Sequence, residues 1–170
     1  SDAEYYVYDS SGGRIRKVME QYIMINNEFK FVQIEEKIYF EGYEIKRNKK
    51  NNLQDNSYDV SLERYSCHVT DDKKRIAIIH KWNIDMKNVE IDDIGLIKVH
   101  YQISDRLGSC QFELDKNEEI ISYEEYYPYG STSYQAGRNI SEVKLKRYRN
   151  TGKERDEETG FYYHGARYLA

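Results

Sequence analysis

Four histidines and two cysteines are the side chains in this sequence that could most readily bind a metal. The histidines occupy scattered positions in strand-like segments: His68, His80, His100 and His164. An isolated histidine of this kind is more often hydrogen-bonded or solvent-facing than a ligand, so we expect neither a metal nor a cofactor. Cys67 and Cys110 lack the spacing of a zinc site. We expect two packed thiols, and a disulfide between them stays open.

Two basic stretches could bind anions. Gly152 and Lys153 do not form a phosphate-binding loop, because Glu154 follows the lysine and the upstream glycine of that motif is absent. The segment KLKRYR, Lys144–Arg149, places an aromatic ring among basic residues. We expect a charged strand that discourages pairing at a sheet edge, and an anion or nucleic-acid site is the alternative.

Composition argues against several classes of protein. The chain has 170 residues, with 26 Lys and Arg against 30 Asp and Glu, and a net charge of −4. We therefore expect no nucleic-acid partner. No run of 18 apolar residues and no signal-peptide pattern is present, so we expect no membrane insertion. Eighteen tyrosines, against one tryptophan and five phenylalanines, favour strands whose hydroxyl ends stay hydrated.

Period-two alternation is the main structural signal. In LIKVHYQIS, one face carries Ile97, Val99, Tyr101 and Ile103, and the other carries Lys98, His100 and Gln102. A turn over Ser104–Gly108 leads to a second strand over Cys110–Asp115, and a third runs from Ile120 towards Pro128 and Gly130. Similar patterns predict strands over residues 5–9, 14–25, 37–45, 58–69, 75–82 and 142–149. Turns are expected at Gly12–Gly13, Asn48–Asn56 and Asp71–Asp72.

The sequence therefore predicts an all-β fold. No segment has a convincing helical pattern, although a short helical turn over 131–138 is compatible with the composition there. Short turns join successive strands, which favours an antiparallel meander in a twisted sheet or partial barrel.

Several segments resemble the Rhs/YD-repeat family. Tyr5–Val18, YYVYDSSGGRIRKV, contains the form Tyr-x-Tyr-Asp-x-x-Gly-x-Arg of a YD repeat, in which Asp9 can cap the turn and Gly12 can supply a positive φ. The later segments are KIYFEGYEI, YQISDRLGSCQFELD, ISYEEYYPYGSTSYQAGR and KRYRNTGKERDEETGFYYHGARYLA. Together they look most like the closing shell region, the Rhs-associated core, of bacterial toxin-complex C subunits, over Tyr5–Ala170.

The resemblance implies that the chain is part of a larger β-sheet shell. Residues 1–147 would form repeat-type sheet, and residues 148–170 would begin the plug of the Rhs-associated core, truncated here. In this family the shell encloses a toxic C-terminal polypeptide, so the implied function is structural, with the cargo absent from this chain. The implied partners are upstream shell repeats or a B-type shell subunit, and the enclosed polypeptide. The implied location is bacterial, secreted or exported within a larger toxin.

The resemblance also implies a role for Asp156. It matches one aspartate of the site at which the family cuts itself to release cargo, and the second aspartate would lie beyond Ala170. Two carboxylates can divide the work of acid and base, whereas one cannot. We therefore expect Asp156 to be half of a catalytic site and this chain not to be an enzyme. The structural alternative places Glu154, Arg155, Asp156 and Arg167 in surface or half-buried ion pairs.

Two other functions stay open on the sequence. The exposed tyrosines of a hydrated sheet could stack on sugars, which would make the chain a carbohydrate- or cell-surface-binding β module. A self-cleaving protease domain is the third possibility. Unpaired sheet edges would also favour a homodimer if this segment stood alone.

Overall fold

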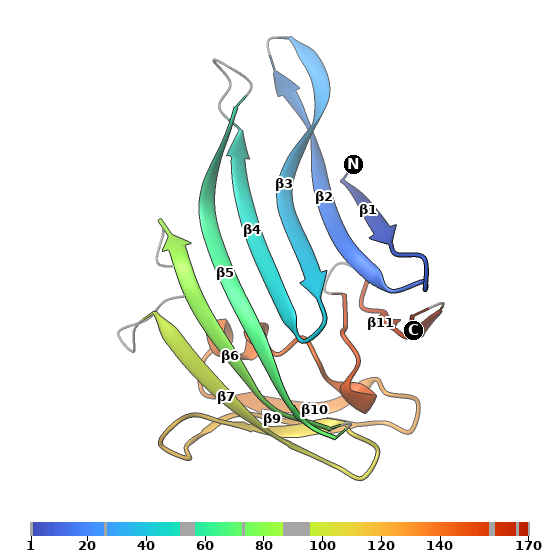
Figure 1. Ribbon diagram of the computed structural model, residues 1–170, viewed down its shortest axis with the longest axis vertical. Helices are drawn as coiled ribbons and strands as arrows, with labels where there is room; N and C mark the ends of the chain where they lie inside the picture. Colours follow the sequence, from blue (N-terminus) through green and yellow to red (C-terminus); the bar gives the residue numbers. More distant parts are fainter. Residues whose placement is uncertain are drawn as a thin grey trace. The chain divides into compact units, whose positions relative to one another are not determined.

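The computed structural model describes residues 2–25, 27–51, 57–72, 74–86, 96–156, 159–165 and 167–169. Ten strands form one sheet in the order β1 to β10, each hydrogen-bonded to the next (Figure 1). They are β1 (Ala3–Tyr8), β2 (Arg14–Ile25), β3 (Glu28–Phe40), β4 (Tyr43–Asn51), β5 (Tyr58–Asp71), β6 (Lys74–Asp85), β7 (Ile97–Ser104), β8 (Cys110–Leu114), β9 (Ile120–Tyr126) and β10 (Thr132–Gly137). The all-β meander predicted from the alternation is confirmed, as an open sheet with β1 and β10 at its edges.

Shorter elements follow the large sheet. They are a helix α1 (Ile140–Leu145), a 3-10 helix η1 (Asn150–Gly152), and a small sheet of β11 (Tyr162–Tyr163) and β12 (Tyr168–Leu169). Among the described residues, neither helix is long and apolar enough to cross a membrane. The chain divides into two compact units: unit 1 comprises Ser1–Cys67 and His80–Ile97, and unit 2 comprises His68–Ile79 and Lys98–Ala170. The boundary expected between residues 147 and 148 stays a prediction.

Unit 1 begins with the hairpin of the YD motif. The Oδ1 atom of Asp9 accepts hydrogen bonds from the backbone N–H groups of Ser11 and Gly13, both at 2.8 Å. Gly12 has a φ of +83°, a conformation that costs little for glycine alone. The predicted turn is therefore confirmed, and β1 and β2 leave it as an antiparallel pair.

Two sequence predictions in unit 1 are wrong in detail. Residues 37–45 are not one strand, because β3 ends at Phe40, Gly42 turns the chain with a φ of +70°, and β4 starts at Tyr43. The polar run from Asn48 was predicted as a turn, yet β4 continues to Asn51. Cross-strand charge pairing explains this continuation, since Lys49 lies 2.9 Å from Glu36 of β3. Residues 52–56 of that run lie outside the described residues.

The sheet of unit 2 buries its polar face. Gln102 of β7, Glu113 of β8 and Ser122 of β9 are in register and all buried. The neighbouring register row of Ile103, Phe112 and Tyr123 lies on the opposite face and is exposed or only half-buried. The alternation in the sequence assigned these residues to the same two faces of the sheet. The polar face is the one that the rest of unit 2 covers.

The segment that covers this polar face begins with a helix where we predicted a strand over residues 142–149. Asn139 caps α1, because its Oδ1 atom accepts from the backbone N–H of Glu142 at 2.8 Å. Its Nδ2 group also donates to Glu142 Oε2 at 2.9 Å. A Cβ atom on Gly137 would lie 2.0 Å from Val143 Cγ2, so α1 packs on bare strand backbone. Local capping and this packing outweigh the strand-like alternation.

The helical turn considered for residues 131–138 is also wrong. These residues contain β10, which pairs antiparallel with β9 through Tyr134–Glu125 and Gln135–Glu124. A turn precedes it, in which Gly130 has a φ of +90° and its N–H donates to the carbonyl oxygen of Tyr127 at 2.8 Å. Pairing along the edge of β9 therefore extends the strand over a sequence with weak propensity.

Replacing the cap residue tests this account of α1. Asn139→Ala removes the acceptor for the Glu142 N–H and should lower the free energy of unfolding by about 1 kcal/mol. Urea denaturation followed by circular dichroism measures the change. Asn139→Ser keeps a capping oxygen and should lose clearly less. Equal losses for the two variants would show that the cap does not stabilise the helix.

Candidate functional site

Five charged or titratable side chains form what we call the charged core of unit 2: His100, Glu113, Glu124, Lys146 and Arg149. The first three come from β7, β8 and β9, and the last two come from the chain after α1. Glu113, Glu124 and Lys146 are each 0% exposed. Ionised groups so deeply buried need matched partners, because the loss of hydration costs several kcal/mol for each ion.

The carboxylate of Glu124 is the best-connected group of the charged core. Its Oε1 atom lies 2.6 Å from Arg149 NH1 and accepts a hydrogen bond from Thr132 Oγ1, also at 2.6 Å. Its Oε2 atom lies 3.4 Å from Lys146 Nζ and 3.2 Å from the hydroxyl of Tyr126. Two cations and two hydroxyls thus surround one anion, which ties the chain after α1 to β9 and β10.

Glu113 is the second buried anion. Gln102 Nε2 donates to its Oε1 atom at 2.9 Å, and Ser122 Oγ donates to its Oε2 atom at 3.0 Å. His100 Nδ1 lies 3.7 Å from the same Oε2 atom. Burial alone would raise the pKa of Glu113, but nearby His100 and Lys146 hold it below its usual value. The ionised form therefore stabilises unit 2 above the usual glutamate pKa, and this contribution is lost as the pH falls.

Cys110 and Tyr126 border the charged core in their neutral forms. Burial raises the pKa of the Cys110 thiol to about 12. Burial and the charge of Glu124 raise the pKa of Tyr126 as well. The Tyr126 hydroxyl donates to the carbonyl oxygen of Cys110 at 2.8 Å. A thiol with such a pKa is not a nucleophile near neutral pH, so Cys110 fills a structural position.

The basic stretch Lys144–Arg149 does not form a strand. Its centre is buried rather than exposed to solvent. Lys146 is fully buried against Glu124, and Arg149 donates to Lys146 O at 3.0 Å as well as to Glu124. The expected charged edge strand is therefore wrong. Lys146 and Arg149 contact the buried carboxylate of Glu124 rather than solvent.

Asp156 lies in the interior of unit 2. Its side chain is 1% exposed, so the expected surface or half-buried ion pair is wrong for this residue. Its backbone N–H donates to Phe161 O at 2.9 Å, and its carbonyl oxygen accepts from Gly160 N at 2.8 Å. Glu154, two residues earlier, is also buried. The structure thus places two acidic side chains of the terminal stretch inside the unit, while a catalytic role for Asp156 stays a prediction.

The histidines occupy four different settings. His80 Nδ1 lies 2.9 Å from Ser66 Oγ in unit 1. In unit 2, His68 accepts from Arg75 Nε at 3.0 Å, His100 belongs to the charged core, and His164 is exposed. No group of three or more His, Cys, Asp or Glu side chains that could hold a metal ion occurs among the described residues.

Both cysteines are free. Cys110 is buried, as expected for a packed thiol, but Cys67 is exposed. The expectation of two packed thiols therefore holds for one of them.

Sequence reasoning missed the charged core as a unit. Two features of the sequence could have indicated it. Glu113, Ser122 and Glu124 lie on the polar side of alternating strands, and the basic stretch Lys144–Arg149 follows them in the chain. Opposite charges on two segments of one domain favour contact between them. Which glutamate meets which cation depends on the turns between the segments, and these are not apparent from alternation.

Removing the central anion tests the charged core. Glu124→Gln leaves Lys146 and Arg149 without their carboxylate and should destabilise the chain by roughly 3 kcal/mol. Urea denaturation, with hydrogen exchange of the β9 amides, measures the loss. Glu125→Gln alters the exposed neighbour on the same strand and should change stability by less than about 0.5 kcal/mol. Similar effects of the two substitutions would contradict our account.

Known proteins resemble this chain along nearly its whole length. No family model matches it. The toxin subunit YenC1 of Yersinia entomophaga is 30% identical over 169 residues, which are 99% of this chain and 16% of that subunit. A crystal structure of TcdB2-TccC3 superposes with a TM-score of 0.77 and 32% identity, covering 97% of this chain and 7% of that one.

A second crystal structure, of TcdB2-TccC3 without its hypervariable C-terminal region, superposes over 97% of this chain and 7% of that one, with a TM-score of 0.76 and 32% identity. The chain thus spans about a sixth of the curated relative, and its matches are segments of much larger toxin subunits. Its tyrosine-rich motifs, its ten-stranded meander and these likenesses agree. The chain is therefore similar, along nearly its whole length, to a segment of bacterial toxin-complex C subunits, in agreement with the Rhs/YD-repeat family that its motifs resemble.

Proposed function

We propose that this segment walls and helps to close a container around a toxic polypeptide, within a subunit that bacteria export as part of a larger toxin. The observation that carries the proposal is the charged core, in which buried ion pairs fasten the chain after α1 to the polar face of β7–β9. A structural closure of this kind needs fixed contacts and no reactive cleft.

The exposed face of the same strands supports the proposal. Phe112 stacks near Tyr123 with ring centroids 4.7 Å apart, and Tyr134 continues the row at 6.1 Å from Tyr123. Ile103 and Tyr134 are more than half exposed. A contiguous row of exposed apolar side chains is a feature of faces that contact another polypeptide. In a shell wall, this exposed apolar face would contact either a neighbouring part of the shell or the enclosed polypeptide.

A segment exchange tests the container function. The matching segment of a toxin-complex C subunit is replaced by this chain, and the chimera is produced with its B-type partner. We expect the C-terminal polypeptide to stay as resistant to added protease as in the parent complex. Rapid digestion of that polypeptide in a folded, correctly assembled chimera would overturn the proposal.

The two glutamates of β9 supply a matched pair for this experiment. A chimera with Glu124→Gln should lose protection, because the chain after α1 is no longer held by its central anion. A chimera with Glu125→Gln should keep protection, since that side chain is exposed.

We further propose that Asp156 supplies one of two carboxylates that cut the chain in a longer version of this protein. In such a reaction one group, as the carboxylate, takes a proton from water while the water oxygen attacks the peptide carbonyl. The other group, as the protonated carboxylic acid, gives its proton to the leaving nitrogen when the C–N bond breaks. What supports the proposal is the match of Asp156 to the family site and its burial, which keeps bulk water away from the carboxylate.

Asp156→Asn tests this role in a version that carries the relatives' downstream segment. The substitution keeps the shape of the side chain but removes its ionised form, and self-cleavage should fall at least about 100-fold. Gel analysis over time measures the rate, and circular dichroism checks the fold. Glu154→Gln, at the buried position two residues earlier, is the control and should cleave normally. Unchanged cleavage by Asp156→Asn would remove this residue from the reaction.

A further inference from the structure

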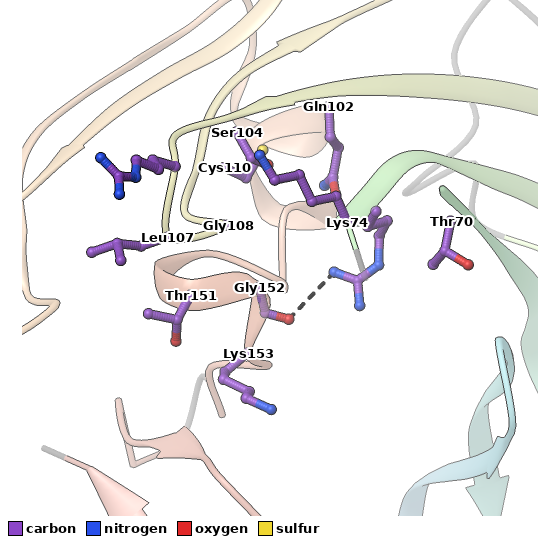
Figure 2. Close-up of a pocket in the computed structure, with 12 residues that line it drawn as sticks. Thr70, Lys74, Gln102, Ser104, Leu107, Gly108, Cys110, Thr151, Gly152 and Lys153 are labelled. Atoms are coloured by element: carbon purple, nitrogen blue, oxygen red, sulfur yellow. Dashed lines mark hydrogen bonds between the residues drawn. The ribbon is translucent and has the colours of Figure 1, made fainter. Parts of the chain in front are cut away.

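A pocket of about 380 Å³ lies within unit 2 (Figure 2). Three segments that are distant in the sequence line it. The hairpin of β5 and β6 contributes three residues. The hairpin of β7 and β8 contributes six, of which Cys110 is the first residue of β8, and η1 with the residue after it contributes three. The pocket is separate from the candidate catalytic residue, because Asp156 is not among the residues that line it.

Cations dominate the lining of this pocket. Lys74, Arg75, Arg106 and Lys153 all contribute to it, and no carboxylate does among the described residues. Asp105, which lies between the lining residues Ser104 and Arg106, is engaged in its own turn, where its Oδ1 atom accepts from Leu107 N at 2.8 Å and Ser109 N at 2.9 Å. Four cations around one concavity, in a chain with a net charge of −4, create a local positive potential that attracts anions.

Arg75 is the fixed cation of the pocket. Its guanidinium lies 3.8 Å from the centroid of the Tyr148 ring, at a distance suited to cation–π contact. Its Nε group donates to His68 Nδ1 at 3.0 Å, and its NH1 group lies 3.5 Å from Gly152 O. Lys74, Arg106 and Lys153 are exposed, so the pocket combines one rigid charge with three solvated ones on long side chains.

The backbone of the pocket does not form a phosphate cradle. Phosphate sites commonly use several backbone N–H groups that point at the ligand. Here the N–H of Gly108 donates to Asp105 O at 3.1 Å, and that of Thr151 donates to Ser109 Oγ at 3.0 Å. The N–H groups of Gly152 and Lys153 donate to Arg149 O and Asn150 O. Recognition therefore falls to side-chain cations, which are spread over three segments.

We propose that this pocket binds an acidic stretch of polypeptide, an extended segment with two or more carboxylates. Separated cations on flexible side chains suit several carboxylates along a chain better than one compact anion. The hydroxyls of Thr70, Ser104 and Thr151 line the same pocket and can donate to carboxylate or peptide oxygens. This inference goes beyond the container function and does not depend on it, since the pocket lies wholly within unit 2.

Fluorescence anisotropy with a short peptide of alternating glutamate and glycine, carrying an uncharged dye, tests the proposal on the 170-residue chain. The triple variant Lys74→Gln, Arg106→Gln, Lys153→Gln removes the three exposed cations. The control triple Lys50→Gln, Lys81→Gln, Lys116→Gln alters exposed lysines that do not line the pocket. Both variants change the net charge by three, from −4 to −7, so the bulk electrostatic effect is matched.

We expect saturable binding that weakens with added salt and falls about tenfold in the pocket variant, with little change in the control variant. A peptide with glutamine at every glutamate position should not bind. Equal binding by the two triple variants, or by the glutamine peptide, would overturn the proposal. Displacement of the peptide by equimolar inorganic phosphate would overturn it too, because the pocket would then be a site for a compact anion.

Discussion

The buried carboxylate of Glu124 is the constraint on which the rest of unit 2 depends. A fully buried anion is costly unless cations and hydrogen-bond donors replace the lost water, and Lys146, Arg149 and Thr132 do so here. The register of β9 decides that Glu124 faces inward, since a shift by one residue would present Glu125 instead. The chain after α1 must then lie across β9, because its cations satisfy that charge.

Buried ion pairs such as those of Glu124 determine how the segments pack against one another more than they add to the free energy of unfolding. Apolar side chains of similar size often give equal or greater stability, but they accept many packings. In unit 2 the charged face accepts the basic chain after α1, while the row of Phe112, Tyr123 and Tyr134 on the other face stays open. This division fixes which face of the sheet is covered within unit 2 and which face stays exposed.

Two kinds of basic side chain therefore follow the sheet of unit 2 and behave differently. Lys146 and Arg149 form ion pairs with Glu124. Lys153, only a few residues later, is exposed and lines the pocket together with other cations. Arg75 is intermediate between these two kinds. Tyr148 and His68 contact it and fix its position, and it also lines the pocket. Burial against an acid makes a cation structural, and exposure beside other cations makes it available to a ligand.

The sequence by itself determined the fold class, most strand positions, the YD turn at Asp9 and Gly12, and the resemblance to toxin-complex C subunits. Those features rest on local alternation, turn chemistry and motif spacing, all of which act between near neighbours in the chain. The helix α1, the burial of Asp156 and the choice of the polar face as the covered one were decided by tertiary structure. Alternation has the same period for either face of a strand, so only the segment that packs on Glu113 and Glu124, and its opposite charge, could decide which face lies inside.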